Sequence, residues 1–116
     1  MIQRIDHIGI AVRRLEERLP LWADALGLPL GGFETVESER VKLAFLRVGP
    51  ARIELLEPTA EDSPIARHLA RRGEGLHHVT LAVADLDASL ARLRERGVEL
   101  VGAAPRPGAG GSRVAF

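Results

Sequence analysis

The sequence predicts an α+β fold of two tandem βαβββ modules, whose strands form a curved mixed sheet around a central cleft. The octamers IDHIGIAV at residues 5–12 and LHHVTLAV at residues 76–83 nearly repeat each other. Both alternate as β-strands do, and each precedes an amphipathic helix. One constant offset in residue number relates the strands and the helices of the two copies. Because the alternation of the strand and the apolar spacing of the helix recur at the same offset, the repeat indicates duplicated modules.

In each octamer the large apolar residues share one strand face, which suits packing beneath a helix. They are Ile8, Ile10 and Val12 in the first copy, and Val79, Leu81 and Val83 in the second. The opposite faces carry a histidine beside small residues. These are His7, Gly9 and Ala11 in the first copy, and His78, Thr80 and Ala82 in the second. Small residues next to a histidine leave room for a bound group.

Each octamer leads into a predicted helix. In the second copy Asp85 is expected as the N-cap and Gly97 as the end of the helix. The first copy has an apolar stripe formed by Leu15, Leu19, Trp22 and Leu26. Since proline is unfavourable inside a helix, the regular helix is expected to begin near Arg18, with Pro20 in its first turn.

Three extended segments complete the first module, at residues 30–36, 40–48 and 52–57. The sequence VGPAR between the last two is typical of a tight turn, which predicts a hairpin.

A connecting helix is expected over residues 62–73, with Ser63 as its N-cap and Pro64 at the first helical position. After its strand and helix, the second module has a predicted strand in VELVG at 98–102 and a glycine-rich stretch at 106–111. A last strand begins at RVAF.

The chain length of 116 residues suits one domain with a sizeable core. We expect a single domain over residues 1–116, with module one at 1–60, the connecting helix at 62–73 and module two at 75–116. Module two is one strand shorter than module one, so it is expected to lack its last strand.

Composition excludes several classes of function. Sixteen basic and sixteen acidic residues give no net charge, which argues against nucleic acid or an anionic membrane as the main partner. No apolar run has the roughly 18 residues that span a bilayer. The chain has no cysteine, so neither disulfides nor thiolate metal sites are expected. Without a recognisable secretory signal, the expected location is cytoplasmic.

The repeated histidines predict a metal site. Along residues 52–57, Ile53 and Leu55 share one face and Glu54 lies on the other. If the apolar pair faces the helix, Glu54 faces the same inner surface as His7. Two modules related by an approximate twofold axis would bring both residues close to His78. Neutral imidazole and carboxylate ligands suit a divalent ion such as cobalt, manganese, iron, nickel or zinc.

Simpler interpretations stay open for each residue. A single strand histidine is often a hydrogen-bonded core or rim residue, and Glu54 could lie on a solvated sheet face. His77, at the repeat position of Asp6, is expected to support or pack, and His68 is expected to be solvated. The glycine-rich stretch at 106–111 is a weak candidate for a phosphate cradle and equally fits a mobile loop over the site.

The chain resembles the vicinal oxygen chelate (glyoxalase/bleomycin resistance/dioxygenase) superfamily and, within it, the methylmalonyl-CoA epimerase family. The stretches that carry this resemblance are IDHIGIAV, VKLAFL, IELLEP, SPIARHLARRGEGLHHV and PRPGAGGSRVAF. They cover nearly the whole chain, and the segment from SPIA to GEGLHH is the most specific part.

The resemblance implies that His7, His78 and Glu54 bind the metal ion, with cobalt as the first expectation. A fourth ligand of the family, a glutamate that is also a proposed acid/base, would lie beyond Phe116. A second carboxylate, proposed as acid/base in some relatives, falls near Leu43, where this chain has no acid. The catalytic residues are therefore unknown from the sequence.

By the same resemblance, the expected reaction is the epimerisation of (2R)- and (2S)-methylmalonyl-CoA. The expected partners are an acyl-CoA substrate and a second copy of the chain in a homodimer. Two alternatives stay open. One is another enzyme on the same scaffold, such as a glyoxalase-type lyase, and the other is a metal-free protein that binds a small molecule.

Overall fold

The computed structural model of the chain describes residues 1–102 and 104–116. The chain forms two compact units. The larger unit is Ile5–Thr80, and the smaller contains Met1–Arg4 and Leu81–Phe116. None of the described helices has the length and apolar character that crossing a membrane requires.

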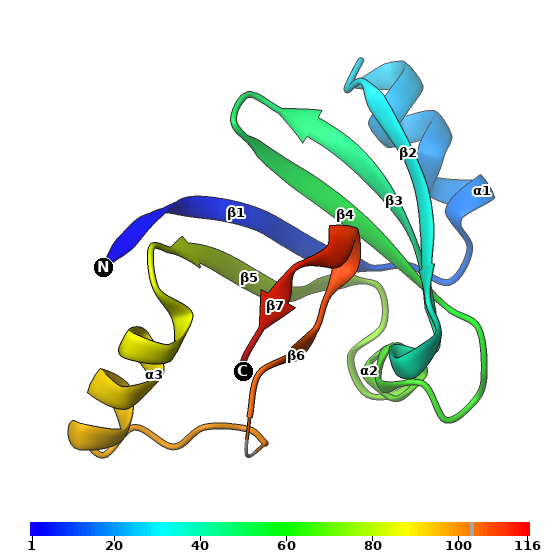
Figure 1. Ribbon diagram of the computed structural model, residues 1–116. Helices are drawn as coiled ribbons and strands as arrows, with labels where there is room; N and C mark the ends of the chain where they lie inside the picture. Colours follow the sequence, from blue (N-terminus) through cyan, green and yellow to red (C-terminus); the bar gives the residue numbers. More distant parts are fainter. Residues whose placement is uncertain (103) are drawn as a thin grey trace. The chain divides into compact units, whose positions relative to one another are not determined.

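The first module has the predicted βαβββ order (Figure 1). Its elements are β1 (Ile2–Ala11), α1 (Leu15–Leu19) with a π-helical continuation (Pro20–Ala25), β2 (Leu30–Val36), a short 3₁₀ turn (Glu37–Glu39), β3 (Val41–Val48) and β4 (Ala51–Pro58). The strand order in the sheet is β2-β3-β4-β1-β5, where β5 is Gly75–Val83. Strand β1 runs parallel to β4, whereas β3 is antiparallel to β2 and β4. The prediction of a mixed sheet is confirmed.

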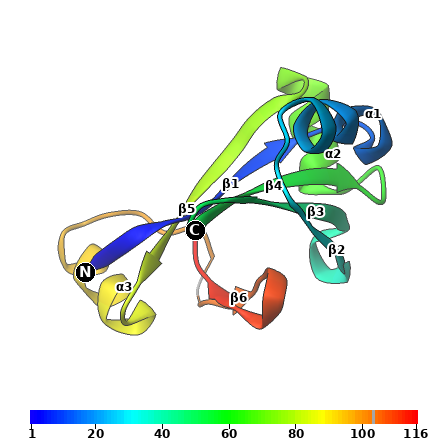
Figure 2. The ribbon, with the colours of Figure 1, turned by 90° about the horizontal axis from the view of Figure 1, so that it is seen from above.

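The core of the larger unit lies on the sheet face that the strand alternation predicted as apolar. Helix α1, which follows β1 directly (Figure 2), covers this face together with its continuation. The fully buried members of the cluster are Val12, Leu15, Ala44, Leu46 and Leu55. Ile10, Ile53 and Trp22 pack against them. Register places Ile10 beside Leu55, so the apolar sides of β1 and β4 coincide.

The start of the first helix differs from the prediction. The helix begins at Leu15 rather than near Arg18. Its first turn is capped from a distance, because the backbone N–H of Leu15 donates to Glu57 Oε1 at 2.8 Å. A carboxylate at a helix N-terminus satisfies a free donor and complements the helix dipole. Local sequence does not reveal such a cap.

Pro20 therefore lies after the first turn, where its missing N–H and its ring disturb a regular helix. The chain accommodates it by widening into the π-helical turn, in which Leu26 N donates to Leu21 O at 2.9 Å. This wider turn also leaves Leu26 exposed, although its sequence position placed it on the buried stripe.

Helix α2 (Pro64–Arg72) confirms the predicted connecting helix. Ser63 is fully buried, and its Oγ accepts a hydrogen bond from Ile65 N at 3.1 Å. Ile65 and Leu69 form the buried side of the helix.

The smaller unit contains α3 (Leu86–Glu95), β6 (Arg106–Pro107), a 3₁₀ turn (Ala109–Gly111) and β7 (Arg113–Val114). Asp85 is the N-cap of α3, as predicted, and accepts from Ala88 N at 3.0 Å. The glycine-rich stretch forms the turn of a short β6–β7 hairpin.

Two expectations for the second module are wrong. The VELVG segment at 98–102 is not a strand, because it pairs with no strand in the described part of the chain. Its backbone bonds run from Val98 N to Leu93 O, at the end of the preceding helix, and from Val101 N to Phe116 O. Val79 and Leu81 are not buried, with exposed fractions of 51% and 46%. They lie on β5, which is the edge strand of the sheet and has one neighbouring strand.

Strands β1 and β5 approach closely at Gly9. A Cβ atom built on this glycine would lie 2.3 Å from Cε1 of His78 and 2.7 Å from its Nδ1. No real Cβ tolerates such a contact, so the space of the missing side chain holds the imidazole ring. Gly9 is thus required here for close packing, not for an unusual backbone angle.

Ser63→Ala should lower the free energy of unfolding by about 1–2 kcal/mol, because α2 loses its N-cap. Urea denaturation of the purified protein measures the change. The exposed Ser38→Ala is the matched control and should change stability by less than about 0.5 kcal/mol. Equal effects of the two substitutions would contradict the assigned role of the cap.

Gly9→Ala should destabilise the fold by about 1–3 kcal/mol, because the new methyl group overlaps the His78 ring. In a His78→Ala background the same change should cost little, and the difference, measured by urea denaturation, isolates this contact. Gly31→Ala is the control, since its Cβ would lie 3.7 Å from its neighbours. Equal costs of Gly9→Ala in both backgrounds would refute the assignment.

Candidate metal centre

Strand register places Glu54 on the same sheet face as His7. Gly9 pairs with Glu54 and His7 with Arg52 in the parallel β1–β4 ladder, and paired residues point to the same side. Both functional side chains are buried, with exposed fractions of 8% for His7 and 2% for Glu54. The predicted placement of Glu54 on the inner face is therefore confirmed.

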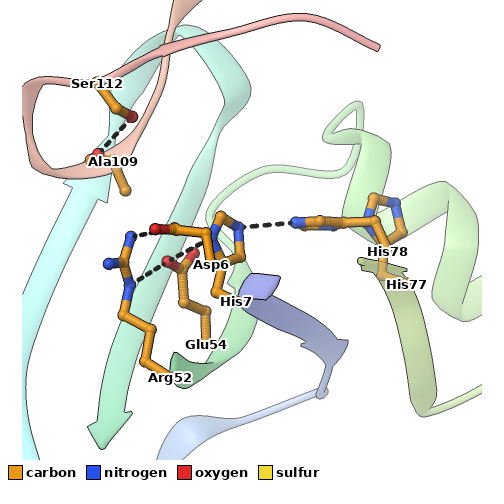
Figure 3. Close-up of polar contacts among 8 residues, drawn as sticks. All are labelled: Asp6, His7, Arg52, Glu54, His77, His78, Ala109 and Ser112. Carbon is orange, nitrogen blue, oxygen red and sulfur yellow. Dashed lines mark hydrogen bonds and ion pairs between the residues drawn. The ribbon is translucent and has the colours of Figure 1, made fainter. Parts of the chain in front are cut away.

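The two repeated histidines meet at their Nε2 atoms, which lie 3.3 Å apart (Figure 3). Their rings are nearly perpendicular, with centroids 5.3 Å apart and an angle of 85°. Two nitrogens that bind one ion at about 2.0–2.1 Å with tetrahedral angles lie about 3.3 Å apart. The His7–His78 pair therefore fits the donor geometry of a divalent metal.

Asp6 and Glu54 face the other ring nitrogen of His7. Asp6 Oδ2 lies 2.8 Å from His7 Nδ1, and Glu54 Oε2 lies 3.5 Å from it. Arg52 joins the two carboxylates, since its Nε donates to Glu54 at 2.8 Å and its Nη2 lies 3.4 Å from Asp6 Oδ2. Figure 3 shows this row of side chains from Arg52 to His78. The guanidinium also lies over the ring of Phe45, 5.3 Å from its centroid.

His77 holds the far side of His78, with 2.8 Å between their Nδ1 atoms. It therefore contacts His78 as Asp6 contacts His7, in agreement with their shared repeat position. The His77 ring also packs edge-on against His68 on α2, with centroids 4.9 Å apart. His68 is consequently half-buried rather than fully solvated. All four histidines of the chain thus form one row.

One set of neutral tautomers satisfies all three hydrogen bonds of this row. A carboxylate only accepts, so His7 Nδ1–H donates to Asp6 and leaves His7 Nε2 as an acceptor. His78 Nε2–H then donates to His7 Nε2. His78 Nδ1 is left to accept from His77 Nδ1–H. The free electron pair of His7 thus faces His78, where a metal would be bound.

Glu54 does not join the histidine pair on its Nε2 side. In the described part of the chain, no group of three or more His, Cys, Asp or Glu side chains converges on one point. The pair of imidazoles meets as predicted, whereas the buried carboxylate of Glu54 is held by Arg52. The assignment of His7, Glu54 and His78 as metal ligands stays a prediction.

The inner face also contains Leu43, near which the resemblance places a second carboxylate. Leu43 pairs with Leu56 across β3 and β4 and is 3% exposed. It has no ionisable group, so no proton carrier stands at this position.

Burial keeps the second-module histidines neutral. Burial, followed by the neighbouring His77 and His7, lowers the pKa of His78 to about 4. Burial and the neighbouring His68 also lower the pKa of His77. Neutral imidazole is the form that binds a metal, so His78 is ready to do so at neutral pH without first losing a charge.

The sequence identified the histidine pair and predicted room for a bound group beside Gly9, whereas the His78 ring fills that room. It missed the roles of Arg52 and Asp6. Arg52, Gly9 and Asp6 hold Glu54, His78 and His7 in place. One signal for Asp6 was available, because it directly precedes the repeated histidine, as His77 does in the second copy.

The metal-free protein should lose stability as pH falls from about 6.5 towards 4. His78 has a lower pKa in the folded protein than its usual 6.5, so the unfolded chain binds this proton first. The stabilisation is complete above pH 6.5 and is lost as pH falls. Urea denaturation with a chelator at pH 7, 6, 5 and 4.5 measures the decline.

His78→Gln should flatten this pH dependence. Glu74, whose pKa is lowered by its hydrogen bond with Arg18, provides the contrast, because its contribution disappears only below its usual pKa of 4.5. Glu74→Gln should therefore leave the decline between pH 6.5 and 4.5 unchanged. An unaltered decline in His78→Gln would contradict the assignment.

Comparison with known proteins identifies the family. Residues 6–116 match the Glyoxalase/Bleomycin resistance protein/Dioxygenase superfamily. The chain is 36% identical over 118 residues to an ethylmalonyl-CoA/methylmalonyl-CoA epimerase of Cereibacter sphaeroides, with 100% of this chain aligned to 88% of that protein.

Comparison with solved structures leads to the same family. A hypothetical protein from Bacillus halodurans C-125 matches with a TM-score of 0.95 and 44% identity, over 97% of this chain and 82% of that one. A variant of Streptomyces coelicolor methylmalonyl-CoA epimerase, in complex with 2-nitronate-propionyl-CoA, matches with a TM-score of 0.94 and 38% identity, over 100% and 87%. The chain therefore belongs to the Glyoxalase/Bleomycin resistance protein/Dioxygenase superfamily and, within it, to the methylmalonyl-CoA epimerase family.

Proposed function

We propose that this chain interconverts (2R)- and (2S)-methylmalonyl-CoA with the help of a divalent metal ion. The observation that carries the proposal is the meeting of His7 Nε2 and His78 Nε2 at 3.3 Å, in a chain that belongs to the epimerase family. The relatives named as epimerases act on this class of acyl-CoA, and their similarity supports the same reaction here.

The reaction removes the proton at C2, between a thioester and a carboxylate, and returns a proton to the opposite face. The intermediate enolate carries negative charge on the thioester oxygen, which must be stabilised as it develops. When bound, a divalent metal supplies this stabilisation as a Lewis acid. Cobalt is the first candidate by resemblance, and manganese, nickel, iron and zinc suit the same donors.

We assign His7, Glu54 and His78 as the metal-binding residues. Asp6 orients His7 by accepting from its Nδ1–H, which fixes the tautomer whose Nε2 carries no hydrogen. Arg52 holds the Glu54 carboxylate in the buried site and compensates its charge. These contacts support a site whose two imidazole donors are arranged before any substrate binds, and Glu54 would have to turn from Arg52 to join them.

Epimerisation needs a proton carrier on each face of the enolate. Leu43 cannot be one, because its side chain has no ionisable group. We therefore propose that both proton carriers are groups other than residue 43. We also propose, by resemblance, that the chain acts as a homodimer in the cytoplasm.

The test is exchange of the C2 proton of methylmalonyl-CoA in deuterated water, followed by NMR, together with direct metal titration. His7→Ala and His78→Ala should each weaken metal binding and lower the exchange rate at least about 100-fold. Chelation should abolish exchange, and added Co²⁺ or Mn²⁺ should restore it. Glu54→Gln should weaken metal binding, because an amide oxygen is a poorer donor than a carboxylate.

Glu61→Gln, at an exposed position, is the matched control and should retain wild-type exchange and metal affinity. Full exchange in the presence of a chelator would refute the metal-dependent mechanism. Metal binding with no exchange of methylmalonyl-CoA would instead favour another enzyme of the superfamily, such as a glyoxalase-type lyase.

A further inference from the structure

Helix α2 has a basic face that the metal centre does not explain. Pro64, Arg67, His68, Arg71 and Arg72 line a shallow cavity of about 230 Å³ that is open to solvent. These positions follow helical spacing along one side of α2, and Ile65 and Leu69 are buried on another. The cavity holds the volume of roughly seven water molecules, which suits a phosphate or diphosphate group.

The charges on this face are not compensated. Helix α2 contains no acidic residue, and in the described part of the chain no carboxylate pairs with Arg67, Arg71 or Arg72. Arg67 donates to the carbonyl oxygen of Asp62 at 2.8 Å. By contrast, arginines elsewhere in the larger unit, such as Arg18, pair with carboxylates.

Repulsion between these arginines opposes the helix. Arg67 and Arg71 are four residues apart, where like charges destabilise a helix. Basic residues in the last turn do complement the helix dipole, which accounts for Arg71 and Arg72 but not for Arg67. A bound anion would relieve the repulsion and use all three guanidinium groups, whose donors match phosphate oxygens.

The basic face lies within reach of the metal centre. The His68 ring lines the cavity and contacts His77, which contacts His78, which meets His7. The three centroid separations along this row are 4.9, 5.0 and 5.3 Å. Together they are shorter than the extended pantetheine arm of coenzyme A, about 16 Å by analogy with an extended peptide backbone.

We propose that the cavity on α2 binds the phosphate groups of the acyl-CoA substrate while the acyl end lies at the His7–His78 pair. This inference rests on the proposed function for its substrate, although the anion site can be tested without any reaction. The arginines anchor the part of the substrate that does not react, and its binding energy holds the acyl group at the metal centre.

The first experiment is a titration of the ¹⁵N-labelled full chain with adenosine 3′,5′-bisphosphate and, separately, with inorganic pyrophosphate. Saturable shifts of the α2 amides are expected, centred on Arg67–Arg72. Arg71→Gln/Arg72→Gln should weaken binding about tenfold. Arg13→Gln/Arg14→Gln removes the same charge from an exposed pair outside the cavity and should leave binding unchanged. Absence of saturable α2 shifts, or equal effects of the two double substitutions, overturns the anion site.

The second experiment compares methylmalonyl-CoA with methylmalonyl-pantetheine, which lacks the phosphates, in the metal-loaded enzyme. Arg71→Gln/Arg72→Gln should raise KM for the CoA thioester about tenfold with kcat unchanged, and should leave KM for the pantetheine thioester unchanged. An equal change with both substrates, or no change with either, overturns the subsite even if the anions bind. Complete inactivity of the wild type with both substrates refutes the proposed function, and the titration alone then decides the anion site.

Discussion

The close approach of β1 and β5 at Gly9 is the constraint on which the candidate site depends. The His78 ring occupies the space that any other side chain at position 9 would fill, and this brings its Nε2 to 3.3 Å from that of His7. The short distance between the two Nε2 atoms would allow the repeated histidines to bind one cation. The lack of a side chain at Gly9 is therefore required for the two imidazoles to meet.

Charge balance is the second requirement of this inner face. Glu54 is almost fully buried, and an isolated carboxylate at such a position would be strongly unfavourable. Arg52 supplies the opposite charge, and its position over Phe45 shields it from water on one side. Removing Arg52 would leave Glu54 without compensation, so the arginine supports the fold and the site together.

The sequence predicted those features of the fold and the site that follow from local residue patterns and from the internal repeat. Strand faces, the caps at Ser63 and Asp85, and the pairing of His7 with His78 follow from spacing and from duplicated residues. It could not predict contacts between distant residues. The cap of α1 comes from Glu57, and Glu54 is turned toward Arg52, which no periodicity reveals. The segment 98–102 has the composition of a strand, but a strand also needs a neighbour to accept its hydrogen bonds.

The hydrogen bonds of the histidine row run in one direction, because His77 donates to His78, His78 to His7 and His7 to Asp6. Metal binding at His78 would reverse the bond between His78 and His77. A cation on His78 would need the electron pair of Nε2, so the single N–H of this neutral ring would have to lie on Nδ1 and donate to His77. His77 then changes from donor to acceptor, and its own N–H moves to Nε2. His68 on α2 contacts this same ring. A change of tautomer in this row would therefore extend from the His7–His78 pair to the ring that His68 on α2 contacts.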